Sequence, residues 1–120
     1  MGVNEWAVAL QFPVGMGVDE LTTQVAAAVD TLGAEENGGA AGQVLVLADV
    51  MGGSPARVAL GEVLAGRAEV VTGANLPMLI EALAGARTMA LPDLARKVAA
   101  SAQSGIRHLG EDLRKGGVPA

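Results

Sequence analysis

The sequence predicts an open α/β domain in which helices cover both faces of a parallel sheet. Apolar strand-like segments alternate with amphipathic helix-like segments along the chain, and this order is typical of a parallel sheet. Residues 44–48 form a short, continuous apolar run, which is the pattern of a strand buried on both faces. With 51% hydrophobic residues among 120, the chain is long and apolar enough to fold around one core. We therefore expect a single domain over residues 1–120.

The first strand and the first helix are predicted from two different periodicities. Residues 5–12 alternate between strongly and weakly apolar side chains, which predicts a strand. Pro13 ends this strand, because proline and the glycines after it break regular structure. Residues 18–32 place apolar side chains at steps of three and four, which predicts a helix. Its predicted core positions are Leu21, Val25, Ala28, Val29 and Leu32.

The middle of the chain predicts a second strand, a second helix and a third strand. A loop over residues 33–42 leads to the strand at residues 44–48. Ser54 is predicted to cap the next helix, and Pro55 to be its first residue, as these residue types prefer those positions. A further buried strand is predicted at residues 68–72. The apolar anchors predicted for the second helix are Val58, Leu60, Val63 and Leu64.

Two more helices complete the predicted fold, and each begins at a proline. Pro77 is predicted to start a helix whose apolar positions are Leu79, Ile80 and Leu83. Pro92 is predicted to start one long final helix that ends at the glycines 116 and 117. The apolar stripe of this final helix contains Leu94, Val98, Ala102, Ile106, Leu109 and Leu113.

Composition excludes several classes of function. Eight Lys and Arg against 13 Asp and Glu give a net charge of −5, which argues against nucleic acid or anionic lipid as a partner. No apolar run has the length that spans a bilayer, and the first residues do not form a signal peptide. The absence of cysteine excludes disulfides and thiolate chemistry, and a single histidine excludes a multi-histidine metal site. We expect a cytoplasmic protein with no metal, no cofactor and no direct insertion into the membrane.

The segment with the strongest chemical signal is residues 49–55, Asp-Val-Met-Gly-Gly-Ser-Pro. It lies at the carboxyl end of a predicted strand, where open α/β sheets bind ligands. Gly52 and Gly53 let the backbone approach a ligand closely, and the helix start after them offers free N–H groups to an anion. A simple tight turn, with Ser54 acting only as a cap, explains the same residues equally well. The segment is neither a P-loop nor a dinucleotide fingerprint, because the required lysine and glycine spacing are absent.

Asp49 requires a separate explanation, because a carboxylate beside an anion site repels phosphate. That repulsion is removed if a cation or an imidazole lies between them. A carboxylate can also accept the N–H of a histidine ring and so leave the other ring nitrogen as the nucleophile. The alternative is a solvated aspartate that caps the turn.

Several stretches of the chain resemble one protein family. Residues 44–55, followed by Glu-Val-Val-Thr-Gly-Ala-Asn-Leu-Pro-Met-Leu at residues 69–79, resemble the IIA component of the mannose-family sugar phosphotransferase system. Residues 13–21 resemble the turn before that family's second helix, and residues 101–109 resemble its last helix. The resemblance covers about residues 5–113.

This resemblance implies a doubly wound parallel sheet and a cytoplasmic phosphoryl carrier that is typically a dimer. In the phosphoenolpyruvate-dependent system, a histidine of the IIA component accepts a phosphoryl group from the carrier protein HPr. It passes the group to a IIB domain, which phosphorylates the incoming sugar. By position, Asp49 would orient the histidine, while Gly52, Gly53 and Ser54 would line the phosphoryl pocket. In the neighbouring loop, the shape would be set by Asn75 and Pro77.

The sequence departs from the family pattern at its start. The family's phosphoacceptor histidine ends a first strand, and a first helix follows, both ahead of the strand that resembles residues 5–12. Neither element is expected within these 120 residues. Because that strand is interior to the family's sheet, we expect a gap in the sheet. His108, the only histidine, is expected to be a helix-boundary residue, with a substitute phosphoacceptor as the alternative.

Three explanations of this departure remain open. The chain is an incomplete version of a phosphoryl carrier, a natural non-catalytic relative, or a domain completed by a strand from another chain. A different class of function is an anion-binding regulatory or structural module of the same fold. A nucleotide-binding enzyme is disfavoured, because no lysine follows the glycines.

Overall fold

The computed structural model describes residues 3–4, 7–13, 15–34, 44–49 and 53–116 of the chain. Its elements follow in the order β1 (Val3–Asn4), β2 (Ala7–Val8), α1 (Val18–Leu32), β3 (Val44–Ala48), α2 (Ser54–Leu64), β4 (Ala68–Thr72), α3 (Leu76–Gly85), α4 (Leu91–Ser104) and α5 (Leu109–Arg114). The predicted bounds of α1, β3 and β4 are confirmed.

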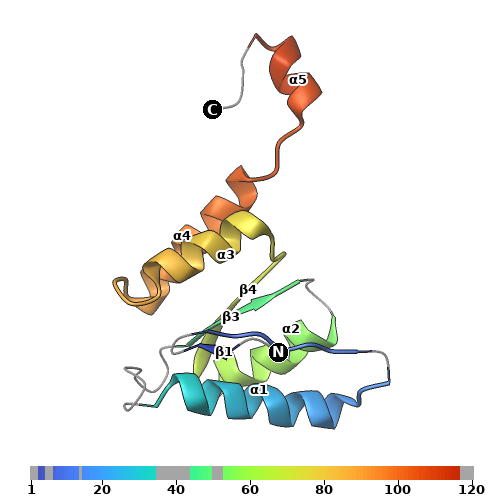
Figure 1. The fold of residues 1–120 in the computed structure, drawn as a ribbon, viewed down its shortest axis with the longest axis vertical. Helices are drawn as coiled ribbons and strands as arrows, with labels where there is room; N and C mark the ends of the chain where they lie inside the picture. Colours follow the sequence, from blue (N-terminus) through green and yellow to red (C-terminus); the bar gives the residue numbers. More distant parts are fainter. Residues whose placement is uncertain (1–2, 5–6, 14, 35–43, 50–52, 117–120) are drawn as a thin grey trace.

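The centre of the fold is a parallel pair of strands with helices on both faces. β3 pairs with β4 in one register, from Val44 opposite Ala68 to Ala48 opposite Thr72. α1 and α2 cover one face of this pair, and α3 and α4 cover the other (Figure 1). The predicted α/β fold with a doubly wound parallel sheet is therefore confirmed.

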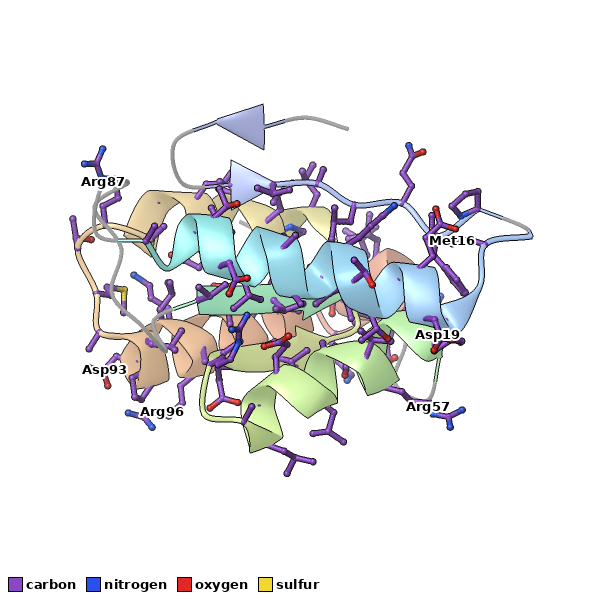
Figure 2. The ribbon with its side chains drawn as sticks, turned by 90° about the horizontal axis from the view of Figure 1, so that it is seen from below. Met16, Asp19, Arg57, Arg87, Asp93 and Arg96 are labelled. Carbon is purple, nitrogen blue, oxygen red and sulfur yellow. The ribbon has the colours of Figure 1, made fainter. Side chains whose placement is uncertain are left out.

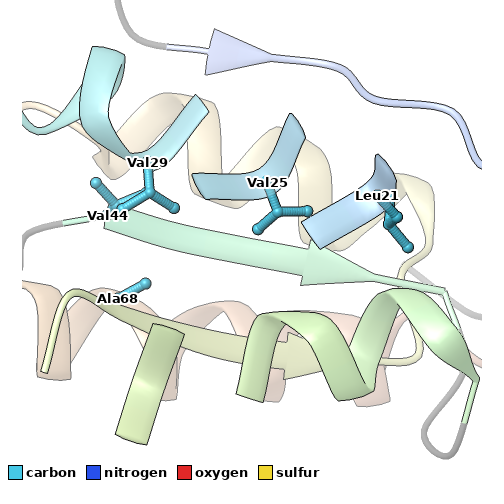
Figure 3. Packing of buried hydrophobic residues seen from close by; sticks show 5 residues of the cluster. All are labelled: Leu21, Val25, Val29, Val44 and Ala68. Carbon is cyan, nitrogen blue, oxygen red and sulfur yellow. The ribbon is translucent and has the colours of Figure 1, made fainter. Parts of the chain in front are cut away.

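Each face of the sheet has its own apolar core. One core contains Leu21, Val25 and Val29 of α1, which pack onto Val44 and Ala68 of the strands (Figure 3). The other core consists of Met78 from α3 with Leu94, Val98 and Ala102 from α4, and Leu45, Leu47 and Val71 pack against it. The alternation along β3 therefore sends neighbouring side chains into opposite cores.

Arg67 ties the first layer together on the way from α2 to β4. Its Nε lies 2.6 Å from Glu62 Oε2, and its Nη2 lies 2.8 Å from Asp30 Oδ1 on α1. Nη2 also donates to the carbonyl oxygen of Ala26 at 3.2 Å. The hydrogen bonds to Glu62 and then Asp30 raise the pKa of Arg67 above its usual value, so this link keeps its charge at physiological pH.

The first predicted strand differs most from the structure. Only Ala7–Val8 of residues 5–12 forms a strand among the described residues, and it pairs antiparallel with β1 instead of joining β3 and β4. A gap separates residues 7–12 from β3, as expected if an interior strand is absent between them. Within the described part of the chain, residues 9–12 pair with no strand.

Three predicted helix starts were wrong by one residue, and the predicted final helix is divided in two. Gly53 is the N-cap of α2 in an extended conformation, and Ser54 is already the first helical residue. α3 and α4 each begin one residue before their proline, at Leu76 and Leu91. The long final helix is interrupted, because α4 ends at Ser104 and α5 is a separate short helix.

Some predicted apolar anchors are exposed. α2 buries Ala56 and Ala59 instead of Leu60 and Leu64. α3 buries Met78. The other large apolar side chains of α3, and those beyond α4, are largely exposed, namely Leu76, Leu79, Ile80, Leu83, Ile106, Leu109 and Leu113.

Candidate functional site

A wide groove of about 1450 Å³ lies between residues 7–12 and the sheet. β3 lines it along its whole length. α1 contributes Val25 and Val29, and α3 contributes Leu79 and Leu83. Most of this wall is apolar, and its polar side chains are those of Gln11, Asp49, Ser54, Asn75 and Arg87. Asp49 follows β3, Ser54 begins α2 and Asn75 follows β4, so these three lie near the carboxyl ends of the two strands.

The polar end of the groove lies at the carboxyl ends of the parallel strands. Asp49 directly follows β3, and α2 begins a few residues later. α1 begins at the same end, as the positions of Asp19 and Arg57 in the first turns of α1 and α2 show (Figure 2). Of the residues that the sequence analysis singled out, Asp49, Gly53, Ser54 and Asn75 line the groove.

The start of α2 offers main-chain N–H groups to the groove. Gly53 is extended, with φ −77° and ψ 164°, and its carbonyl oxygen accepts from Arg57 N at 3.1 Å. No side chain caps this helix, so the amides of Ser54 and Ala56 have no acceptor within it, and Pro55 has no N–H. Within the described part of the chain, the Ser54 hydroxyl also makes no hydrogen bond. These donors suit an anion such as a phosphoryl group.

Asn75 has a structural role beside the groove. Its Oδ1 accepts from Met78 N at 3.1 Å and so caps α3, while its Nδ2 donates to the carbonyl oxygen of Ala102 at 3.0 Å. Ala74 N donates to the carbonyl oxygen of Ala48 at 3.0 Å, which fixes this loop against the end of β3. Asn75 therefore holds α3, α4 and the groove wall in one arrangement.

Pro77 and Gly52 stand apart from the other predicted site residues. Pro77 is in the first turn of α3, packs against Gly105 at the end of α4, and does not line the groove. Gly52 lies outside the residues that the structure describes.

His108 lies away from the groove and its candidate anion site. It is the N-cap of α5, which projects away from the body of the molecule (Figure 1). Its side chain is 71% exposed, and Nδ1 lies 3.1 Å from Glu111 Oε2. His108 does not line the groove.

The sequence missed the contribution of α3 to the groove. Leu79 and Leu83 are apolar positions of the predicted helix, and in the structure they are exposed and line the groove. An apolar helical stripe looks the same whether it faces a filled core or an empty space, so periodicity alone carries no signal for this difference.

Two further properties follow from the described residues. No three His, Cys, Asp or Glu side chains among them lie close enough together to hold a metal ion. None of the helices they form has the length and apolar character needed to cross a bilayer.

Comparison with known proteins places this geometry in a family. Residues 3–99 match the family model EIIA-man, described as the PTS system fructose IIA component. The chain is similar to the solved structure of phosphotransferase system component EIIA from Streptococcus agalactiae, with 26% identity and a TM-score of 0.67. That match covers 82% of this chain and 72% of the other.

A second solved structure gives the same result. The PTS IIA protein associated with the fucose utilization operon of Streptococcus pneumoniae is 27% identical, with a TM-score of 0.66, and the match covers 82% of this chain and 68% of the other. Comparison with curated proteins gives no match. Because the family model matches most of the chain, this protein belongs to the EIIA-man family of phosphotransferase-system IIA components.

Proposed function

We propose that this chain forms the IIA domain of a mannose-family phosphoryl relay, with residues 1–120 as one cytoplasmic domain. In this proposal HPr donates the phosphoryl group, a IIB domain receives it, and the relay drives sugar uptake. The accepting histidine comes from outside these 120 residues. The observation that supports the proposal most strongly is the meeting of Asp49, Gly53 and Ser54 at the polar end of one groove.

Each residue has a defined part in this relay. An imidazole nitrogen forms a bond to phosphorus as the bond between phosphorus and HPr breaks, and the same exchange then passes the group to the IIB domain. Asp49 accepts the N–H of the other ring nitrogen and fixes the tautomer. The amides of Ser54 and Ala56 and the Ser54 hydroxyl donate to the phosphoryl oxygens.

The test is transfer of labelled phosphate from phosphoenolpyruvate through enzyme I and HPr. The 120-residue chain is expected to acquire no stable, acid-labile label, since His108 lies outside the groove. The same chain extended by its natural upstream codons is expected to be labelled on a new histidine. His108→Ala in the extended chain serves as the control and is expected to leave the labelling intact. Acid-labile label on His108 of the 120-residue chain contradicts the proposal.

A second function is favoured by the position of the only histidine. Because His108 lies outside the groove, the chain as it stands suits an anion-binding regulatory or structural module. Phosphate-dependent thermal stabilisation, together with an upstream region that encodes no histidine, favours this module over the relay.

We also propose that the domain is a homodimer. The exposed apolar side chains of Ile106, Leu109 and Leu113 support this proposal, because exposed apolar side chains gathered on one segment mark an interaction surface. Sedimentation velocity is expected to show a dimer that Leu109→Glu with Leu113→Glu converts to a monomer. Leu64→Glu, on the exposed side of α2, is the control that leaves the dimer unchanged. A monomeric parent chain contradicts the proposal.

A further inference from the structure

Arg57 lies at the carboxyl edge of the sheet, near the candidate anion site. It is exposed and belongs to the first turn of α2, where its N–H donates to the carbonyl oxygen of Gly53 at 3.1 Å. Its side chain lies at the same edge as Asp19, whereas Asp93 and Arg96 lie at the opposite edge (Figure 2). Arg57 does not line the groove. Its guanidinium is therefore placed to meet a group that arrives from solvent.

The position of Arg57 opposes the electrostatics of its helix. The start of a helix carries partial positive charge, so a cation in the first turn lowers helix stability and an anion raises it. α1 follows this rule, with Asp19 and Glu20 in its first turn. α2 has no acidic residue there and carries Arg57 instead. Local conflicts of this kind are expected at functional positions.

Arg57 also differs from most other cations of the chain in its contacts. Within the described residues, its guanidinium makes no hydrogen bond or ion pair. Arg114 also forms no ion pair there, but it lies in the last turn of α5, where a cation is favourable. Five cations pair with carboxylates at 2.6–3.4 Å, namely Arg67, Arg96, Lys97, Arg107 and Lys115. In this part of the chain, Arg57 thus combines an available guanidinium with a position that is unfavourable for it.

The candidate anion site needs a positive charge close to it. Asp49 and Ser54 both line the groove, and Asp19 lies at the same edge, so carboxylates there repel a phosphoryl dianion. The Cα–Cβ bond of a helical residue leans toward the helix N-terminus, which directs the Arg57 side chain over the start of α2. One helical turn spans about 5.4 Å, and an arginine side chain can bring its guanidinium across that turn to the amides of Ser54 and Ala56.

We propose that Arg57 is a specificity-determining residue, which recognises the phosphoryl dianion carried by an incoming phosphoprotein. Its guanidinium donates two hydrogen bonds to phosphoryl oxygens as the group arrives at the start of α2, a geometry that arginine forms with phosphate. The group stays bonded to its carrier during this recognition, so no bond forms or breaks. The inference rests on the proposed function for the identity of that carrier, HPr.

Binding of inorganic phosphate to the 120-residue chain tests the recognition without any transfer step. NMR follows the amide chemical shifts of Ser54 and Ala56 at about pH 8, where phosphate is a dianion, with ionic strength held constant by sodium chloride. Arg57→Gln is expected to weaken phosphate binding by about fivefold, the effect of losing charged hydrogen bonds near solvent. Arg57→Lys keeps the charge without the paired donors and is expected to bind with intermediate affinity.

Arg96→Gln is the matched control, because it removes the same charge at the opposite edge of the sheet (Figure 2). It is expected to leave the affinity for phosphate unchanged. Thermal melts separate recognition from a structural role. Arg57→Gln removes a cation from the first turn of α2, so it is expected to keep or slightly raise the melting temperature. A loss of affinity caused by local unfolding would lower the melting temperature instead, and would contradict the inference.

Phosphorylated and unphosphorylated HPr distinguish a phosphoprotein from free phosphate as the source of the dianion. Calorimetric titration gives the affinity of the 120-residue chain for each form, and no transfer to this chain is expected during the measurement. Arg57→Gln is expected to weaken binding of phosphorylated HPr by about tenfold. Its affinity for unphosphorylated HPr is expected to equal that of the parent chain.

The other outcomes contradict either this inference or the relay. Phosphate binding that is equal in the parent and Arg57→Gln, or absent from both, contradicts the inference. An equal loss of affinity for both forms of HPr shows that Arg57 contacts the protein surface, which also contradicts it. Phosphate binding that depends on Arg57, without binding of either form of HPr, identifies free phosphate as the ligand and contradicts the recognition of a phosphoprotein. Failure to label the extended chain, with the Arg57 results as expected, contradicts the relay alone.

Discussion

Replacing Met78 with alanine is expected to lower the free energy of unfolding by about 2–5 kcal/mol. Met78 is fully buried and belongs to the core that joins α3 to α4. The shorter side chain loses apolar burial and leaves a cavity between Leu94 and Val98. This loss is a large share of the stability of a small domain, which is about 5–15 kcal/mol in total. Urea denaturation followed by circular dichroism measures it.

Two matched variants show whether this loss comes from the cavity. Met78→Leu nearly conserves the volume, and we expect a cost below about 1.5 kcal/mol. Leu64→Ala removes a large apolar side chain that is 81% exposed, so it is expected to change stability by no more than about 0.5 kcal/mol. If Met78→Ala costs no more than Leu64→Ala, then Met78 is not a core residue in solution.

Gly105→Ala is expected to lower the free energy of unfolding by about 1–3 kcal/mol, the typical cost of overpacking. A Cβ at this position would lie 2.5 Å from Cγ of Pro77. The proline ring cannot rotate away, so α4 would have to move relative to the start of α3. Thermal or urea denaturation gives the size of the effect.

Gly61→Ala is the matched control for this substitution. Gly61 lies within α2, and a Cβ there meets nothing within 4 Å. Alanine is therefore expected to raise stability by roughly 0.5–1 kcal/mol, the usual penalty of glycine inside a helix. A Gly105→Ala variant that also gains stability would show that the two helices are not in contact at this point.

The sequence analysis predicted best those elements in which the apolar periodicity matches the side chains that the fold buries. α1 and β3 match their predicted bounds, because each buries the side chains that its periodicity selects. The interruption after Ser104 could not be predicted in this way. It falls at Gly105, the C-cap of α4, which lies against Pro77, a residue distant in sequence.

The candidate site was predicted in part. The order of strand, Asp49, glycines and helix placed Asp49, Gly53 and Ser54 at one end of the sheet, because strand ends and helix starts meet there in α/β folds. The long apolar wall beyond them was not predicted as a groove. Leu79 and Leu83 carry the pattern of buried residues, and only the three-dimensional arrangement shows that their face is open.

The division of the interior into two cores has a consequence for how the domain opens. Among the described residues, the two cores lie on opposite faces of one pair of short strands, so little apolar contact couples them. We expect sub-global unfolding, in which α3 and α4 separate at a lower free energy than complete denaturation. Each half would then behave as its own cooperative unit, and the narrow sheet would act as the joint between them.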